Sequence, residues 1–200
     1  MRKHTVAAII GFVTIVTVQA QGILNTATNA NWTSQAPLWV STPWGVSFTT
    51  GNNNTTLLTI ALDILTPATS SFQVDVYDNS SLTPGNFLGN LSGSTTANSI
   101  CTYTTSGINL SANTTYWLVM SDPAGSDIGM VYNPTSTSTD GWTTGPLVFN
   151  PGDTWRQFGQ GWVPLMEFNA VPEPSTMALA IMGLGGLIIC LFKKKAPLNK

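Results

Sequence analysis

The sequence predicts an all-β domain, an antiparallel two-sheet sandwich of jelly-roll type, placed between an N-terminal signal peptide and one C-terminal transmembrane helix. Three observations indicate the sandwich. Apolar and polar residues alternate over short segments, as they do in half-buried strands. Turns rich in Gly, Pro and Asn join these segments at irregular spacing. No part of residues 21–174 has a helical repeat, which argues against a parallel sheet because its crossovers need helices.

Two strands are predicted in the first half of this body. The first lies within residues 57–65, and its apolar face is made of Leu58, Ile60, Leu62 and Ile64. The opposite face of that strand is made of Thr59, Ala61 and Asp63. The second spans residues 72–78, with an apolar face of Phe72, Val74 and Val76 that alternates with Gln73, Asp75 and Tyr77. The period of two predicts that each strand buries one face.

Turn residues indicate where the remaining strands of the body lie. Asn52 to Thr56 predict a solvated turn, and Pro84-Gly85 is a turn dipeptide followed by an extended segment at residues 87–91. Later strands are expected within residues 100–108, 114–122, 155–162 and 164–168, and the last of these closes the domain.

The N-terminus has the pattern of a secretory signal peptide. Arg2, Lys3 and His4 precede an apolar stretch at residues 6–18, and cleavage is expected after Ala20. A short transmembrane helix is the alternative, but an apolar stretch of about 13 residues does not span ~30 Å of hydrocarbon.

The C-terminal region has the pattern of a membrane span. Residues 175–192 carry no charged side chain. At about 1.5 Å per residue a helix of this length reaches ~27 Å, close to the thickness of a bilayer core. Lys193, Lys194 and Lys195 follow and are expected to stop transfer, which leaves this end in the cytoplasm and the body outside.

A proline-rich motif stands directly before that span. The order of Val171, Pro172, Glu173 and Pro174, an apolar span and a lysine cluster resembles the PEP-CTERM sorting signal of Gram-negative bacteria. The resemblance implies passage across the inner membrane, recognition by an exosortase, removal of the tail, and delivery to the cell surface or the exopolysaccharide matrix. Glu173 is the residue that the enzyme is expected to read, because two prolines hold the motif extended. A permanent single-pass anchor with a Pro-rich stalk is the alternative.

The body has a resemblance of its own. The segments "GVSFTTG" at 45–51, "FQVDVYD" with the following "LTPGNFLGNLSG", and "LSANTTYWLVMSD" at 110–122 are similar to the secreted family called choice-of-anchor R. This implies a fold and a location but no catalytic activity. The expected organisation is a signal peptide at 1–20, a lead-in at 21–44, the sandwich at 45–168, a linker at 169–174, a transmembrane helix at 175–192 and a basic tail at 193–200.

Charge excludes some partners. Between residues 21 and 174 there are one basic and nine acidic side chains, so the exported body has a net charge of one minus nine, or −8. Nucleic acids and anionic membrane surfaces attract clustered Lys and Arg, and this body has none. Its acidity favours solubility among extracellular polymers.

The body also offers little for catalysis, and we predict that it is not an enzyme. His4 is the only histidine of the chain and leaves with the signal peptide. Cys101 therefore has no histidine to activate it and is expected to be a small buried residue. Asp75 with Asp78, or Asp122 with Asp127, would supply a carboxylate pair for glycoside hydrolysis, but nothing in their spacing selects one.

Two kinds of binding site remain as alternatives. Oxygen-rich turns make structural calcium the candidate cofactor, with the ligands Asp122, Asp127 and Asp153. Trp39, Trp44 and Trp142 fall in predicted loops and would form a platform for the sugar rings of an exopolysaccharide. The competing interpretation of these tryptophans is that they seal the ends of the sandwich.

Overall fold

The computed structural model describes residues 21–25, 35–38, 42–64, 71–94, 96, 99–124, 128–133, 137–138, 141–158 and 163–173. Over these residues every regular element is a strand, and the strands form two antiparallel sheets. The prediction of an all-β body with two antiparallel sheets is therefore confirmed. None of the described residues belongs to a helix that is long and apolar enough to cross a membrane. The predicted signal peptide at 1–20 and transmembrane helix at 175–192 lie outside the described residues.

The larger sheet, called sheet A, has eight strands. Its main path runs in the order β10 (Thr137–Ser138), β1 (Gln21–Asn25), β14 (Met166–Pro172), β4 (Thr55–Ile64), β9 (Ile128–Asn133) and β13 (Val163–Pro164). Two further strands join it, with β7 (Ser99–Leu110) on β4 and β2 (Gln35–Leu38) on β9. The residues predicted as a lead-in, 21–44, thus contribute β1 and β2 to this sheet.

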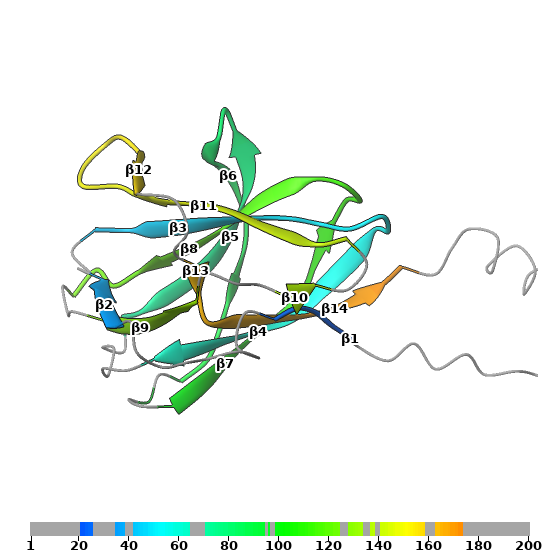
Figure 1. Ribbon diagram of the computed structural model, residues 1–200, viewed down its shortest axis with the longest axis horizontal. Coiled ribbons are helices and arrows are strands. Elements are labelled where there is room, and N and C mark those ends of the chain that lie inside the picture. The colour runs from blue at the N-terminus through cyan, green and yellow to red at the C-terminus, as the bar shows by residue number, and fades with distance from the viewer. Residues whose placement is uncertain are drawn as a thin grey trace, which may run out of the picture.

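The second sheet, called sheet B, has six strands. Their order is β12 (Arg156–Phe158), β11 (Thr143–Phe149), β3 (Trp44–Thr49), β8 (Thr115–Ser121), β5 (Gln73–Ser80) and β6 (Thr83–Leu91). Figure 1 shows β3, β5, β8 and β11 of this sheet above β4, β7 and β14 of sheet A.

The core lies between the two sheets. Phe48 of β3 stacks on Trp142 with ring centroids 5.9 Å apart, and it lies 4.7 Å from the ring of Phe168 on β14. Phe48 and Phe168 are fully buried, and Trp142 is 1% exposed. Because these aromatic rings come from both sheets, their burial holds the two layers face to face.

The predicted apolar face of β4 is correct except at its start. Ile60, Leu62 and Ile64 are fully buried, but the buried residue before them is Leu57, and Leu58 is only half-buried. The pairing of β4 with β7 shifts register between Leu57 and Thr59. A bulge at this point reverses which face of the strand the preceding side chains occupy. The alternation that holds from Ile60 onward therefore predicts the wrong buried residue before it.

The hairpin between β5 and β6 also differs from the prediction. Val74 and Val76 are fully buried as expected, but Pro84-Gly85 does not form the turn. The turn lies at Ser81 and Leu82, which both have positive φ, 51° and 67°. Pro84 belongs to β6, where it pairs with Asn79. A proline is tolerated there because β6 is the last strand of sheet B. No further strand of the described residues pairs with its outer edge, so a missing backbone N–H on that edge costs no hydrogen bond within the sheet.

Candidate functional site

The first residues of the proline-rich motif lie at the end of β14. Val171 pairs with Thr56 and Pro172 with Thr55, and both motif residues are half-buried. The backbone N–H of Glu173 then donates a hydrogen bond to the carbonyl oxygen of Asn54, 3.0 Å away. Glu173 is exposed, so its carboxylate faces solvent while its backbone is tied to the turn between β3 and β4. Pro174 lies outside the described residues.

This arrangement corrects the predicted domain boundary at Phe168. The strand continues through most of the predicted linker at 169–174, because Met166, Phe168 and Ala170 are all buried on one face. The same period of two was present in the sequence, but Ala170 is too small to have stood out as a core residue. The last described strand therefore ends at Pro172, and the motif begins within this strand.

The other end of the body lies beside the motif. Gln21 is the first residue of β1 and pairs with Ala170 of β14. Figure 1 shows β1 and β14 side by side. If the signal peptide is removed after Ala20, which lies outside the described residues, the new N-terminus is Gln21. Both ends of the exported body then meet on adjacent antiparallel strands.

The predicted sugar platform is wrong for two of its three tryptophans. Trp44 is 6% exposed and packs on Phe149 and Phe158, with ring centroids 5.6 and 4.9 Å away. Trp142 is stacked parallel to Phe48 in the core. Their neighbouring Gly and Pro residues suggested loops, but loop position does not determine exposure. Trp39 lies outside the described residues.

The predicted calcium ligands have different surroundings. Asp122 is 1% exposed, and its Oδ1 accepts hydrogen bonds from the Ser71 hydroxyl and from the backbone N–H of Ala124 at 3.0 Å. Asp153 is exposed in the turn after β11, and Asp127 lies outside the described residues. Within the described ranges, no three His, Cys, Asp or Glu side chains are placed to hold a metal ion together. Asp122 ties the turn after β8 to the residues just before β5.

Cys101 and Asp78 also serve the fold. Cys101 is buried on β7, as predicted, and its sulfur accepts a hydrogen bond from the backbone N–H of Thr96 at 3.1 Å. Asp78 accepts two hydrogen bonds from Asn86, one from the backbone N–H at 2.6 Å and one from the side-chain amide at 2.9 Å. These bonds brace the β5–β6 hairpin.

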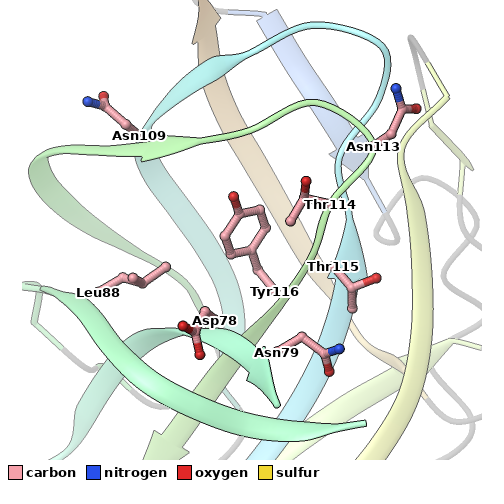
Figure 2. A pocket seen from close by; sticks show the side chains of 8 residues that line it. All are labelled: Asp78, Asn79, Leu88, Asn109, Asn113, Thr114, Thr115 and Tyr116. Carbon is pink, nitrogen blue, oxygen red and sulfur yellow. The ribbon is translucent and has the colours of Figure 1, made fainter. Parts of the chain in front are cut away.

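A hollow of about 480 Å³ lies between the β5–β6 hairpin and the turn that joins β7 to β8. Figure 2 shows the Tyr116 ring at its centre, near Asp78 and Thr114, with Asn109 and Asn113 at the rim. Most of its polar groups are already bonded within the protein. The Tyr116 hydroxyl accepts from the N–H of Ser111 at 2.8 Å. Asn79 Oδ1 accepts from the indole N–H of Trp117 at 2.9 Å.

The comparisons with known proteins point to the C-terminal motif. Residues 170–195 match the family described as the PEP-CTERM protein-sorting motif. A search of curated proteins finds no match. The matched span contains the proline-rich motif and the three lysines, so the predicted PEP-CTERM resemblance is confirmed. The motif indicates an exported protein that is anchored transiently in the membrane and sorted by an exosortase.

Proposed function

We propose that this chain is a non-enzymatic protein of the cell surface or extracellular matrix of a Gram-negative bacterium, released there when an exosortase removes its C-terminal tail. The sorting motif at 170–195 supports this proposal. The resemblance of the body to choice-of-anchor R proteins and its net charge of −8 between residues 21 and 174 agree with an extracellular site.

The single observation that carries the proposal is where the fold ends relative to the motif. Ala170 is fully buried, Pro172 ends the last strand, and Glu173 is the first exposed residue of the motif. A cut beyond Glu173 leaves every core residue that the structure describes in place. A cut before Ala170 would remove strand pairing and buried surface. The fold therefore favours processing on the C-terminal side of Glu173.

The hydrogen bonding and burial of three acidic side chains support the proposal that the protein is not an enzyme. Asp78 and Asp122 are bonded to groups of their own chain, and Asp63 is 4% exposed, which removes it from contact with a substrate. A general acid or base exchanges a proton with the substrate, whereas Asp78 and Asp122 already accept hydrogen bonds from their own chain and Asp63 is buried.

The test is to replace Glu173 in the full chain and follow its processing in the producing cells. With Glu173→Gln we expect the unprocessed protein to accumulate in the inner membrane, because the exposed carboxylate is lost. Asp153→Asn is the matched control, since it removes one exposed carboxylate that lies outside the motif, and it should be processed like the parent. Equal processing of Glu173→Gln and the parent would contradict the assigned role of Glu173.

A further inference from the structure

The outer face of sheet B carries a second group of aromatic residues, separate from the core. Trp117, Val119 and Val148 are buried there, and Tyr77 and Trp155 pack over them. Tyr77 meets Phe87 of β6 edge-on, with ring centroids 5.6 Å apart and planes at 74°. Phe87 is 56% exposed, so its ring is supported by Tyr77 and remains open to solvent. Such a fixed, exposed ring is suited to contact an apolar surface of a ligand.

A polar hollow of about 490 Å³ adjoins this ring. Its lining includes Gln73 and Asp75 of β5 with Phe87 and Asn90 of β6. Asp75 and Asn90 are directly paired across the two strands. Tyr77 and Phe87 are paired two positions further along β5, after a register shift. The bulged register thus places a carboxylate, two amides and an aromatic ring around one hollow of a size common in ligand sites.

The polar groups of this hollow differ from those around Tyr116. Within the described part of the chain, the side chains of Gln73, Asp75 and Asn90 make no hydrogen bond. Asp75 is half-buried, and burial raises the pKa of its carboxyl above the ordinary value of 3.8. A carboxylate that is partly removed from water and has no donor is destabilised, and ligand hydroxyl groups would offset that cost.

Charge decides between classes of ligand. Arg156 is the one basic residue between positions 21 and 174, so an anionic ligand would meet eight excess negative charges and little compensation. A metal ion needs several oxygen ligands, and no group of three suitable side chains lies together in the described ranges. A neutral ligand with many hydroxyl groups fits the donor and acceptor set. Its hydroxyls can donate to the carboxylate and both donate to and accept from the amides.

We propose that the hollow formed by Gln73, Asp75, Phe87 and Asn90 binds neutral hexose units of an extracellular polysaccharide. Phe87 contacts the apolar face of a sugar ring, and Asp75 accepts hydrogen bonds from adjacent hydroxyls. Gln73 and Asn90 bond the remaining hydroxyls. This goes beyond sorting, and it places the sugar site on the outer face of sheet B instead of on the buried tryptophans. The binding does not depend on the tail, so it is tested separately from the processing.

The experiment measures retention of the protein, isolated from the producing cells, on immobilised dextran, mannan and galactan, with alginate as the anionic comparison. We expect binding to at least one neutral polymer and weaker binding to alginate. Asp75→Asn and Phe87→Ala should each weaken the neutral binding by about tenfold or more, because a charge-assisted hydrogen bond or a ring contact is lost. Circular dichroism melting of each variant separates loss of binding from loss of folding.

Two matched controls accompany these variants. Asp153→Asn removes an exposed carboxylate elsewhere, and Ile100→Ala removes a side chain that is 61% exposed on sheet A. Both should bind like the parent. The proposal is overturned if no neutral polymer is retained, or if alginate binds more tightly. It is also overturned if Asp75→Asn and Phe87→Ala are folded and bind like the parent. The same holds if the two control variants lose as much binding as Asp75→Asn and Phe87→Ala.

Discussion

The backbone N–H of Glu173 lies 3.0 Å from the carbonyl oxygen of Asn54, and this hydrogen bond joins the sorting motif to the turn between β3 and β4. Asn54 is exposed with its neighbours Asn52 and Asn53, so the bond is at the surface of the protein. Backbone hydrogen bonds at an exposed strand end open more easily than those of the core. Glu173 is therefore held at the edge of the fold without being buried in it.

Truncation tests where the fold ends. A chain of residues 21–173 should unfold at the same urea concentration as the chain with its tail, because every strand of the described sheets lies within residues 21–172. A chain that ends at Phe168 loses four pairs of β14 with β4, which join residues 169–172 to Thr59, Leu57, Thr56 and Thr55. We expect it to be less stable by about 2 kcal/mol or more. Equal stability of the two truncated chains would contradict the boundary at Pro172.

Phe168→Ala tests the contact between the sheets. Phe168 is fully buried, and its ring lies 4.7 Å from Phe48 and 6.2 Å from Trp142. Truncation leaves a cavity between the layers and should lower the free energy of unfolding by about 3–5 kcal/mol. Leu82→Ala serves as the control, because Leu82 is 72% exposed and should change stability by less than about 0.5 kcal/mol. Urea unfolding measures both variants.

Ser81→Asn with Leu82→Gly tests the turn between β5 and β6. Both positions have positive φ, which costs energy for Ser and Leu but suits Asn and Gly. The double variant should raise the free energy of unfolding by about 1 kcal/mol. Pro84→Asn, which places an Asn-Gly pair at residues 84 and 85, has no such benefit, because these residues lie inside β6. A double variant at 81 and 82 that is less stable than the parent would contradict the turn described.

Asp63→Asn tests the cost of a buried charge. Asp63 is 4% exposed, its Oδ2 has no hydrogen-bond partner among the described residues, and burial raises the pKa of its carboxyl above 3.8. The folded protein therefore binds this proton more tightly than the unfolded chain does, so the contribution of Asp63 to stability falls as pH rises from 3.8 through the folded pKa. At pH 7 the variant should melt a few degrees higher.

The control is the pH dependence of the difference in melting temperature between Asp63→Asn and the parent. Near pH 3 the carboxyl is protonated in both states, so the advantage of Asp63→Asn should vanish. Asp153→Asn, at an exposed turn, should show no comparable change with pH. A melting temperature of Asp63→Asn below that of the parent at pH 7 would show that the carboxylate has a stabilising role.

The alternation of apolar and polar residues correctly predicted side-chain burial where burial depends only on the local sequence pattern. Val74 and Val76 of β5, and Ile60 and Leu62 of β4, have the burial that the period of two requires. The bulge at Leu58 could not be read from one strand, because it exists only in the pairing of β4 with β7. The turn at Ser81 and Leu82 escaped notice for a related reason: neither residue favours positive φ, and tertiary pairing imposes it.

The functional residues divide in the same way. The sorting motif is contiguous, so the sequence alone was sufficient to find it. Trp44 and Trp142 were misjudged because burial of a loop-adjacent side chain depends on what folds over it. The hollow beside Phe87 was missed because Asp75 and Asn90 meet only when β5 and β6 pair.

The mass of the mature protein tests the central claim most directly. Material harvested from outside living cells is measured intact by mass spectrometry, and its two ends are then sequenced. We predict an N-terminus at Gln21, a C-terminus on the far side of Glu173, and no residue from the apolar span at 175–192. Protein recovered outside the cells with that span and Lys200 still attached would contradict the account.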